Sequence, residues 1–186
     1  MRLVGFDADV ARAHGLEVVT LPDGSLASVP AAKADAARKG AYVPTSGVIK
    51  KRAVDGQAGK SSGDVVSPYG YGEATDPSCG TSWVYLDPIG GARANLGTGM
   101  KLVVDAGDPW DVHWHVNIED NGGNSTQAYS EEDGFLGPFS WTAYARKLSL
   151  TRGWAQATVV WYGSYTVTEN AWVCWSEGPS AGDSIW

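Results

Sequence analysis

The chain has 186 residues, a formal net charge of −7 and a hydrophobic fraction of 43%. This length suffices for one ordinary domain plus a tail, and the composition excludes a wholly disordered chain. Residues 76–186 carry five Lys/Arg against thirteen Asp/Glu, which makes that part a poor nucleic-acid binder because phosphate contacts need basic surface.

The first predicted element is a short helix that begins after Asp7 and ends before Gly15. The Asp7 carboxylate is a natural N-cap, and glycine is favoured just past the last helical turn. Two β-prone runs on either side of an Asp-Gly pair at 23–24 then predict a hairpin. Residues 1–30 are therefore interpreted as a helix–hairpin docking segment within an extended N-terminal arm.

Residues 31–77 are interpreted as a flexible linker. Residues 31–37 are Ala-rich enough for one helical turn, but 39–77 are rich in Gly, Ser, Lys and Pro without a hydrophobic period. Seven basic and two acidic residues lie between positions 33 and 60. Such a stretch could touch nucleic acid, but it is more typical of a solvated linker or a docking strand for an acidic protein.

The aromatic part of the chain is residues 78–186, because all nine tryptophans lie beyond position 82. Turn residues separate β-prone runs at 81–87, 101–106, 110–120, 140–150, 154–168 and 171–176. The run at 154–168 is long for one strand and is expected to bulge or bend at Gly163. Its Trp161 is expected to face the core. The pattern predicts an all-β fold, either an antiparallel β-sandwich or a small barrel.

The two cysteines, Cys79 and Cys174, are expected to form a disulfide that ties the first strand of this body to the last. Two unrelated buried thiols are the alternative, and the spacing fits no zinc site. A bridge would stabilise the fold by roughly 4–5 kcal/mol on the chain-entropy model. Together with the tryptophan usage, it favours an oxidising compartment.

The apolar runs, the N-terminus and the cysteines bear on the cellular location of the protein. No stretch approaches the roughly 18 apolar residues of a transmembrane helix, so membrane insertion is not expected. The N-terminus lacks the apolar region of a signal peptide. The chain is thus interpreted either as cytosolic or as a mature secreted form with an added methionine, and the cysteines favour the second.

The candidate chemical groups predict neither an enzyme nor a metal or cofactor site. His113 and His115 share one strand face with Asp111, which is typical of an exposed polar face. A metal site would need a third ligand, and a pH-sensitive contact surface is the other alternative. Carboxylates at 119–120 and 131–133 adjoin turns, whereas glycoside hydrolysis needs two facing carboxylates.

Tryptophan is too abundant for every ring to be buried in one small core, so some rings are expected to bind sugars or protein partners. The residues assigned to partner binding are Phe6, Val10, His14, Val18, Leu21, Tyr42, Trp83, Tyr85 and Trp175.

The phrase DADVARAHGLEVVTLPDGSLASVP at 7–30, followed by a linker and then CGTSWVYL at 79–86, resembles small secreted β proteins of actinobacteria. It is similar in organisation to the adaptor subunit of the secreted umbrella toxin particles of streptomycetes. There, a small β adaptor links the spokes of a large repeat-containing toxin to a trypsin-like lectin subunit. Its extended N-terminal segment serves for docking.

This resemblance implies a non-catalytic secreted adaptor whose partners are a repeat-containing toxin and a lectin-like subunit. A carbohydrate-binding module or small secreted hydrolase is the main alternative, and it would require the body to bind glycans. A third hypothesis is an inhibitor that presents the Lys-containing arm to a serine-protease-like cleft.

Overall fold

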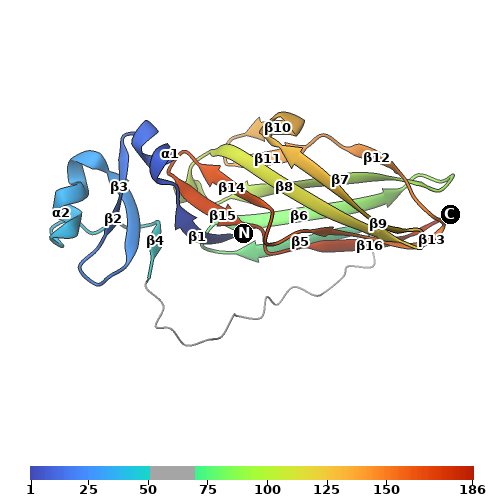
Figure 1. Cartoon of the computed structure of the whole chain (residues 1–186), viewed down its shortest axis with the longest axis horizontal. Coiled ribbons are helices and arrows are strands. Elements are labelled where there is room, and N and C mark those ends of the chain that lie inside the picture. Colours follow the sequence, from blue (N-terminus) through green and yellow to red (C-terminus); the bar gives the residue numbers. More distant parts are fainter. Residues whose placement is uncertain (51–69) are drawn as a thin grey trace.

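The computed structural model describes residues 1–50 and 70–186. Figure 1 shows a long β-sandwich with a smaller unit at one end. All strand pairs in its sheets are antiparallel, so the predicted all-β fold is confirmed. The helical elements are short: α1 (Ala8–Ala13), α2 (Ala34–Arg38), η1 (Ala31–Lys33), η2 (Val104–Ala106) and η3 (Glu131–Asp133).

Two sheets form the sandwich. The first, here the β8 sheet, has the order β1 (Arg2–Phe6), β15 (Trp172–Trp175), β14 (Tyr165–Thr168), β8 (Pro109–Asp120), β13 (Gly153–Val159) and β16 (Ser180–Ile185), with β9 (Gly123–Ser130) also paired to β8. The second, here the β7 sheet, has the order β10 (Gly134–Gly137), β11 (Ser140–Ala143), β7 (Arg93–Leu102), β6 (Gly80–Pro88) and β5 (Tyr71–Asp76), with β12 (Arg146–Ser149) also paired to β7.

The smaller unit, here the N-terminal unit, spans residues 16–49. It contains α2 and a sheet of three strands, β2 (Leu16–Thr20), β3 (Leu26–Pro30) and β4 (Val48–Ile49). Its own small core includes Val19 and Val29. The unit lies close to the sandwich at Gly47, because a Cβ at this position would lie only 2.5 Å from the indole of Trp172.

The structure bears out the predicted helix and hairpin, but the segment 1–30 is not a free arm. The Asp7 carboxylate caps α1 by accepting hydrogen bonds from the N–H groups of Asp9 and Val10. β1, however, pairs with β15 in the sandwich, and Met1 is fully buried in the sandwich core. Local sequence patterns could not show this, because the two strands lie at opposite ends of the sequence.

The predicted flexible linker over 31–77 also differs from the structure. Residues 31–49 belong to the folded N-terminal unit, and residues 71–76 form β5 at the edge of the β7 sheet. The remaining part of the predicted linker, 51–69, lies outside the described residues. Alanine-rich α2 is short and buries only Ala34 and Ala37, so it gave a weak sequence signal.

The predicted strands of the body agree with the structure where side chains alternate. On β8, Val112, Trp114 and Val116 are fully buried while His113 between them is exposed. The predicted strand at 101–106 is wrong, because β7 ends at Leu102 and η2 follows. Glycines inside β7 obscured this strand, since glycine is depleted in strands.

The long run at 154–168 pairs with β8 as two strands, β13 and β14, and a bulge of five residues separates them. β13 ends opposite Val116 and β14 begins opposite His113, so residues 160–164 face only residues 114–115. The expected bulge is therefore present. It also turns Trp161 outward, to 52% exposure, which overturns the expectation that this ring faces the core.

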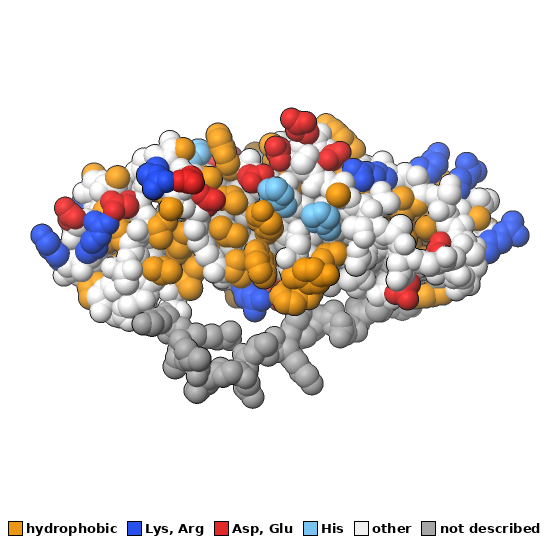
Figure 2. Space-filling model, viewed as in Figure 1, with side chains coloured by type: hydrophobic (Ala, Val, Ile, Leu, Met, Phe, Trp, Pro, Cys, Tyr) orange, Lys and Arg blue, Asp and Glu red, His pale blue; other side chains and the backbone are white. Residues whose placement is uncertain are grey.

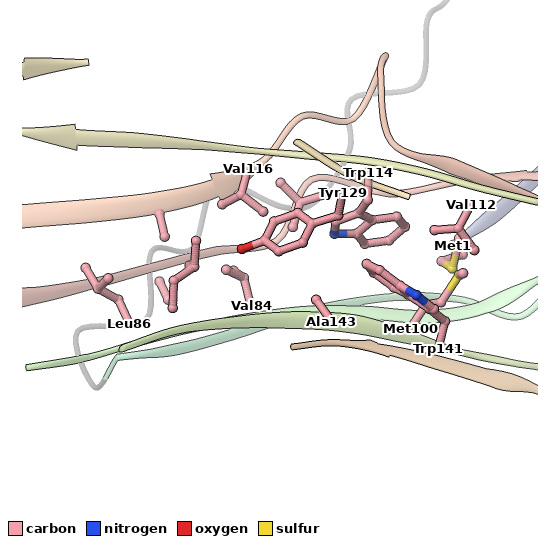
Figure 3. Packing of buried hydrophobic residues seen from close by; sticks show 14 of the residues in the cluster. Met1, Val84, Leu86, Met100, Val112, Trp114, Val116, Tyr129, Trp141 and Ala143 are labelled. Carbon is pink, nitrogen blue, oxygen red and sulfur yellow. The ribbon is translucent and has the colours of Figure 1, made fainter. Parts of the chain in front are cut away.

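Aromatic rings and aliphatic side chains from both sheets fill the core (Figure 3). Trp114 on β8 and Trp141 on β11 pack with ring centroids 5.8 Å apart. The indole N–H of Trp114 donates to the Thr98 hydroxyl at 2.8 Å, and that hydroxyl donates to the carbonyl of Trp83 at 2.8 Å. This chain of hydrogen bonds crosses the core and satisfies the buried indole N–H of Trp114 and the hydroxyl of Thr98.

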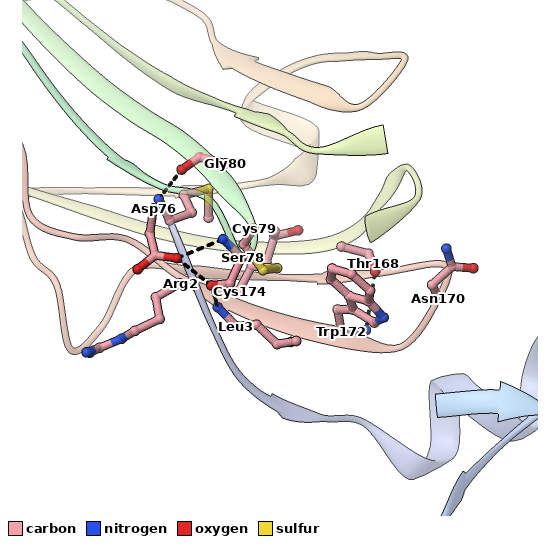
Figure 4. The surroundings of a disulfide bond; sticks show 12 residues. Arg2, Leu3, Asp76, Ser78, Cys79, Gly80, Thr168, Asn170, Trp172 and Cys174 are labelled. Carbon is pink, nitrogen blue, oxygen red and sulfur yellow. Dashed lines mark hydrogen bonds between the residues drawn. A yellow bond between two sulfur atoms is a disulfide. The ribbon is translucent and has the colours of Figure 1, made fainter. Parts of the chain in front are cut away.

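The expected disulfide joins Cys79 and Cys174, with their Cα atoms 5.9 Å apart (Figure 4). Cys79 lies in the turn between β5 and β6, and Cys174 lies on β15. The bridge therefore links the two sheets. The expectation that the bridge ties the first strand of the body to the last is wrong. The last strand is β16, which follows β15 and pairs with β13 at the far edge of the β8 sheet.

Because Tyr129 on β9 is buried, we expect the free energy of unfolding to fall at alkaline pH. Its ring is 4% exposed, and burial raises the pKa of its phenol to about 12. Because the folded pKa exceeds the unfolded value of about 10, the unfolding free energy is constant below pH ~10 and falls by roughly 2–3 kcal/mol up to pH ~12. We expect Tyr129→Phe to reduce this fall, as measured by urea unfolding at neutral and alkaline pH.

The same variant should retain or slightly gain stability at neutral pH, because the Tyr129 hydroxyl has no hydrogen-bond partner among the described residues. Tyr162→Phe is the matched control, since this ring is 66% exposed. An unchanged alkaline fall in Tyr129→Phe would assign the pH dependence to other groups.

Candidate binding surfaces

A row of side chains crosses five strands on the outer face of the β8 sheet. The strand register places Arg2 beside Trp175, Trp175 beside Tyr165, Tyr165 beside His113, and His113 beside Ser130. Tyr165 and His113 stack with ring centroids 4.7 Å apart. Figure 2 shows hydrophobic side chains gathered beside the histidines on this face.

The bulge at 160–164 adds two projecting rings to the row. Trp161 and Tyr162 are 52% and 66% exposed, and their rings meet edge to face with centroids 5.5 Å apart. The Trp161 ring also lies 6.3 Å from that of Trp175. The name "aromatic row" is used below for Trp161, Tyr162, Trp175, Tyr165 and His113.

His115 holds the bulge in place from the same face. Its ring Nδ1 lies 2.9 Å from the carbonyl oxygen of Gly163, and its backbone N–H donates to the Ser164 hydroxyl at 3.0 Å. The backbone N–H of Val160 donates to the His115 carbonyl at 2.9 Å. The bulge is thus anchored at three points, which positions Trp161 and Tyr162 on a rigid sheet.

Charged groups border the row. The Asp111 carboxylate lies 3.1 Å from Nε2 of His113, and Arg2 forms an ion pair with Glu177 at 3.1 Å. Burial, followed by the charge of Asp111, raises the pKa of Tyr165, so its phenol is neutral near pH 7 and is available as a hydrogen-bond donor. The row therefore combines apolar rings with donors and acceptors at its edge.

His113 and His115 occupy the exposed polar strand face that their alternation predicts. Within residues 1–50 and 70–186, no group of three or more His, Cys, Asp or Glu side chains is placed to hold a metal ion. Each histidine instead has another contact: His113 with Asp111 and Tyr165, and His115 with the bulge.

The predicted partner-binding residues Trp83 and Tyr85 lie on β6, on the other sheet from Trp175. Their rings are parallel, with an interplanar angle of 1° and centroids 6.0 Å apart, and both side chains are partly exposed. The structure therefore divides these three predicted residues between two separate surfaces.

The predicted partner-binding residues of the arm are all partly buried. Phe6 packs against the sandwich core, and Leu21 and Tyr42 pack against the core of the N-terminal unit. Val10 and Val18 are half-buried in α1 and β2. His14 contacts the exposed ring of Trp110 edge-on, at 4.7 Å between centroids, near the junction of the two parts of the molecule.

Of the aromatic row, only Trp175 is among the partner-binding residues predicted from the sequence; Trp161, Tyr162, Tyr165 and His113 are not. The sequence signal for an outward-projecting segment is that the run at 154–168 is too long for one strand and contains Gly163. A bulge there was expected, but its length sets which side chains point outward.

Comparisons with protein-family models, with curated proteins and with solved structures find no match for this chain. The disulfide indicates an oxidising, extracellular type of environment. In the part of the chain that the structure describes, no helix has the length and apolar character needed to cross a membrane.

Proposed function

We propose that the chain is a non-catalytic secreted adaptor that binds a protein partner through the aromatic row. The observation that supports this most is the contact of Trp161 with both Tyr162 and Trp175, on a surface where Trp161 and Tyr162 are more than half exposed. Clustered Trp and Tyr side chains dominate the energy of protein interfaces. Val173, two residues before Trp175 on the same face of β15, adds a partly exposed aliphatic side chain beside the row.

An adaptor needs a second surface, and the N-terminal unit offers one at the end of the molecule (Figure 1). Leu26 and Val43 in this unit are 41% and 75% exposed. The proposed partners are the two that the sequence resemblance implies, a large repeat-containing toxin and a lectin-like subunit, in an extracellular antibacterial complex. The disulfide supports secretion, because such bonds persist in oxidising compartments.

The test is capture of partners from the culture supernatant of the producing bacterium. The immobilised full chain is compared with the double variant Trp161→Ala/Tyr162→Ala, and retained proteins are identified by mass spectrometry. We expect the wild type to retain a repeat-containing toxin or lectin-like protein. With the purified partner, the double variant should raise Kd at least about thirtyfold, the effect of losing one interface hot spot.

Trp154→Ala is the matched control, because Trp154 is 47% exposed and lies on β13 outside the aromatic row. This variant should bind like the wild type. Deleting the N-terminal segment is not a suitable test, since β1 and the buried Met1 belong to the sandwich. Equal affinity of the double variant and the wild type for the partner would contradict the proposal.

A further inference from the structure

The outer face of the β7 sheet carries a second aromatic surface, organised differently from the aromatic row. The strand register places Glu73, Trp83, Gly99 and Thr142 side by side across four strands. At the next position on the same face of the sheet, two residues along β6, Tyr85 lies between Tyr71 and Gly97. Two aromatic rings of β6 therefore face two glycines of β7, with polar side chains on the strands beyond.

The glycines let the two rings lie over the neighbouring strand. A Cβ at Gly97 would lie 2.1 Å from Cε1 of Tyr85, and one at Gly99 would lie 2.6 Å from Cζ2 of Trp83. Any larger residue would displace these rings. Because the strand backbone fixes both glycines, the Trp83 and Tyr85 rings are held parallel, 6.0 Å apart between centroids.

Hydrogen-bonding groups border the rings. The Tyr71 hydroxyl donates to the Glu73 carboxylate at 3.0 Å, which leaves further acceptor positions on that carboxylate. Burial raises the pKa of Tyr71, and Glu73 adds to this effect, so the phenol stays protonated near pH 7. On the opposite side, Thr142 is exposed, and Lys101 is exposed one register position along.

We propose that Trp83 and Tyr85 form a binding site for an extended oligosaccharide of pyranose units. A pyranose has an apolar C–H face that packs on an aromatic ring and a margin of hydroxyl groups that need hydrogen bonds. The parallel rings supply the first requirement for adjacent sugar units. Glu73, Thr142 and Lys101 supply acceptors and donors at the margin.

The chemistry of this face favours a sugar over a protein partner. From β5 to β11, the register positions that contain Trp83 and Tyr85 hold Glu, Tyr, Gly and Thr. The Trp83 position continues on β10 to Phe135, an exposed aromatic ring, so it includes no aliphatic side chain. The aromatic row on the β8 sheet, in contrast, adjoins the partly exposed aliphatic side chain of Val173 on β15. The glycan site lies on the other sheet and does not depend on the proposed adaptor function.

The test measures binding of the full chain to chitin, cellulose, xylan and purified peptidoglycan, using sedimentation of the insoluble polymer. We expect retention by at least one polymer. Trp83→Ala and Tyr85→Ala should each weaken that binding at least about tenfold, whereas Trp83→Phe, which keeps an aromatic ring, should stay within about threefold. Soluble oligosaccharides of the bound polymer should compete.

Two controls separate this site from other effects. Trp161→Ala should leave polymer binding unchanged, and Trp83→Ala should leave capture of a protein partner unchanged, so each proposal can fail alone. Thermal unfolding of every variant checks that it is folded. Lack of retention of the wild type by all four polymers would overturn the glycan site, as would retention insensitive to both alanine substitutions.

Discussion

Replacing Cys79 and Cys174 together by alanine is expected to lower the free energy of unfolding by about 4–5 kcal/mol. The bridge spans a sequence separation of 95 residues, and closing a loop of that length removes much conformational entropy from the unfolded chain. Both sulfur atoms lie in the sandwich core at 0% exposure of their residues. A domain of ordinary stability, about 5–15 kcal/mol, would lose a large part of it.

Urea unfolding of the oxidised wild type and of the double alanine variant measures this effect through the midpoint and slope. A single Cys174→Ala variant is a useful companion, because it removes the bridge but keeps one thiol in the core. It should lose nearly as much stability as the double variant. A loss below about 1 kcal/mol in the double variant would mean that the bridge adds little beyond the packing of the two sheets.

Strand alternation made much of this sandwich predictable. β8 alternates buried and more exposed residues from Val112 to Glu119, and this pattern is visible in the sequence. β7 directs every second residue, including Leu96, Thr98 and Met100, into the core, while Gly97 and Gly99 lie on the other face and are also buried. Because glycine is typical of turns, the sequence concealed a central strand whose glycines are required by the rings lying over them.

Long-range pairing explains what sequence patterns missed in the N-terminal part. The run Arg2–Phe6 carries no partner information, yet it pairs with Trp172–Trp175. The helix cap at Asp7 and the hairpin turn near Asp23 were predictable because each depends on a few adjacent residues. The proposed binding surfaces required register across several strands, and that register comes only from the folded structure.

The two proposed surfaces follow from one property of a sandwich. Each sheet buries one face and exposes the other, so aromatic residues on outer faces point away from each other. Trp175 and Trp83 illustrate this, since both stand out in the sequence yet lie on different sheets. Mutations on one outer face should therefore leave binding at the other intact, and the paired controls above depend on that separation.

Trp114→Ala is expected to destabilise the fold by about 3–5 kcal/mol. The side chain is fully buried, and its ring packs on Trp141. Truncation removes its apolar contacts and leaves a cavity between the sheets that the surrounding strands can only partly close. The Thr98 hydroxyl keeps the Trp83 carbonyl as its acceptor, so lost packing accounts for most of the effect.

Two further variants separate packing from hydrogen bonding at this position. Trp114→Phe keeps a ring but removes the N–H donor to Thr98, and it should cost clearly less than the alanine variant. Trp154→Ala removes an indole from the same sheet where it is 47% exposed, and it should cost less than about 1 kcal/mol. Urea unfolding of all three variants gives the comparison. If Trp114→Ala cost no more than Trp154→Ala, the assignment of Trp114 as a central contact between the two sheets would be wrong, because a buried indole cannot be removed from a close-packed core at the cost of an exposed one.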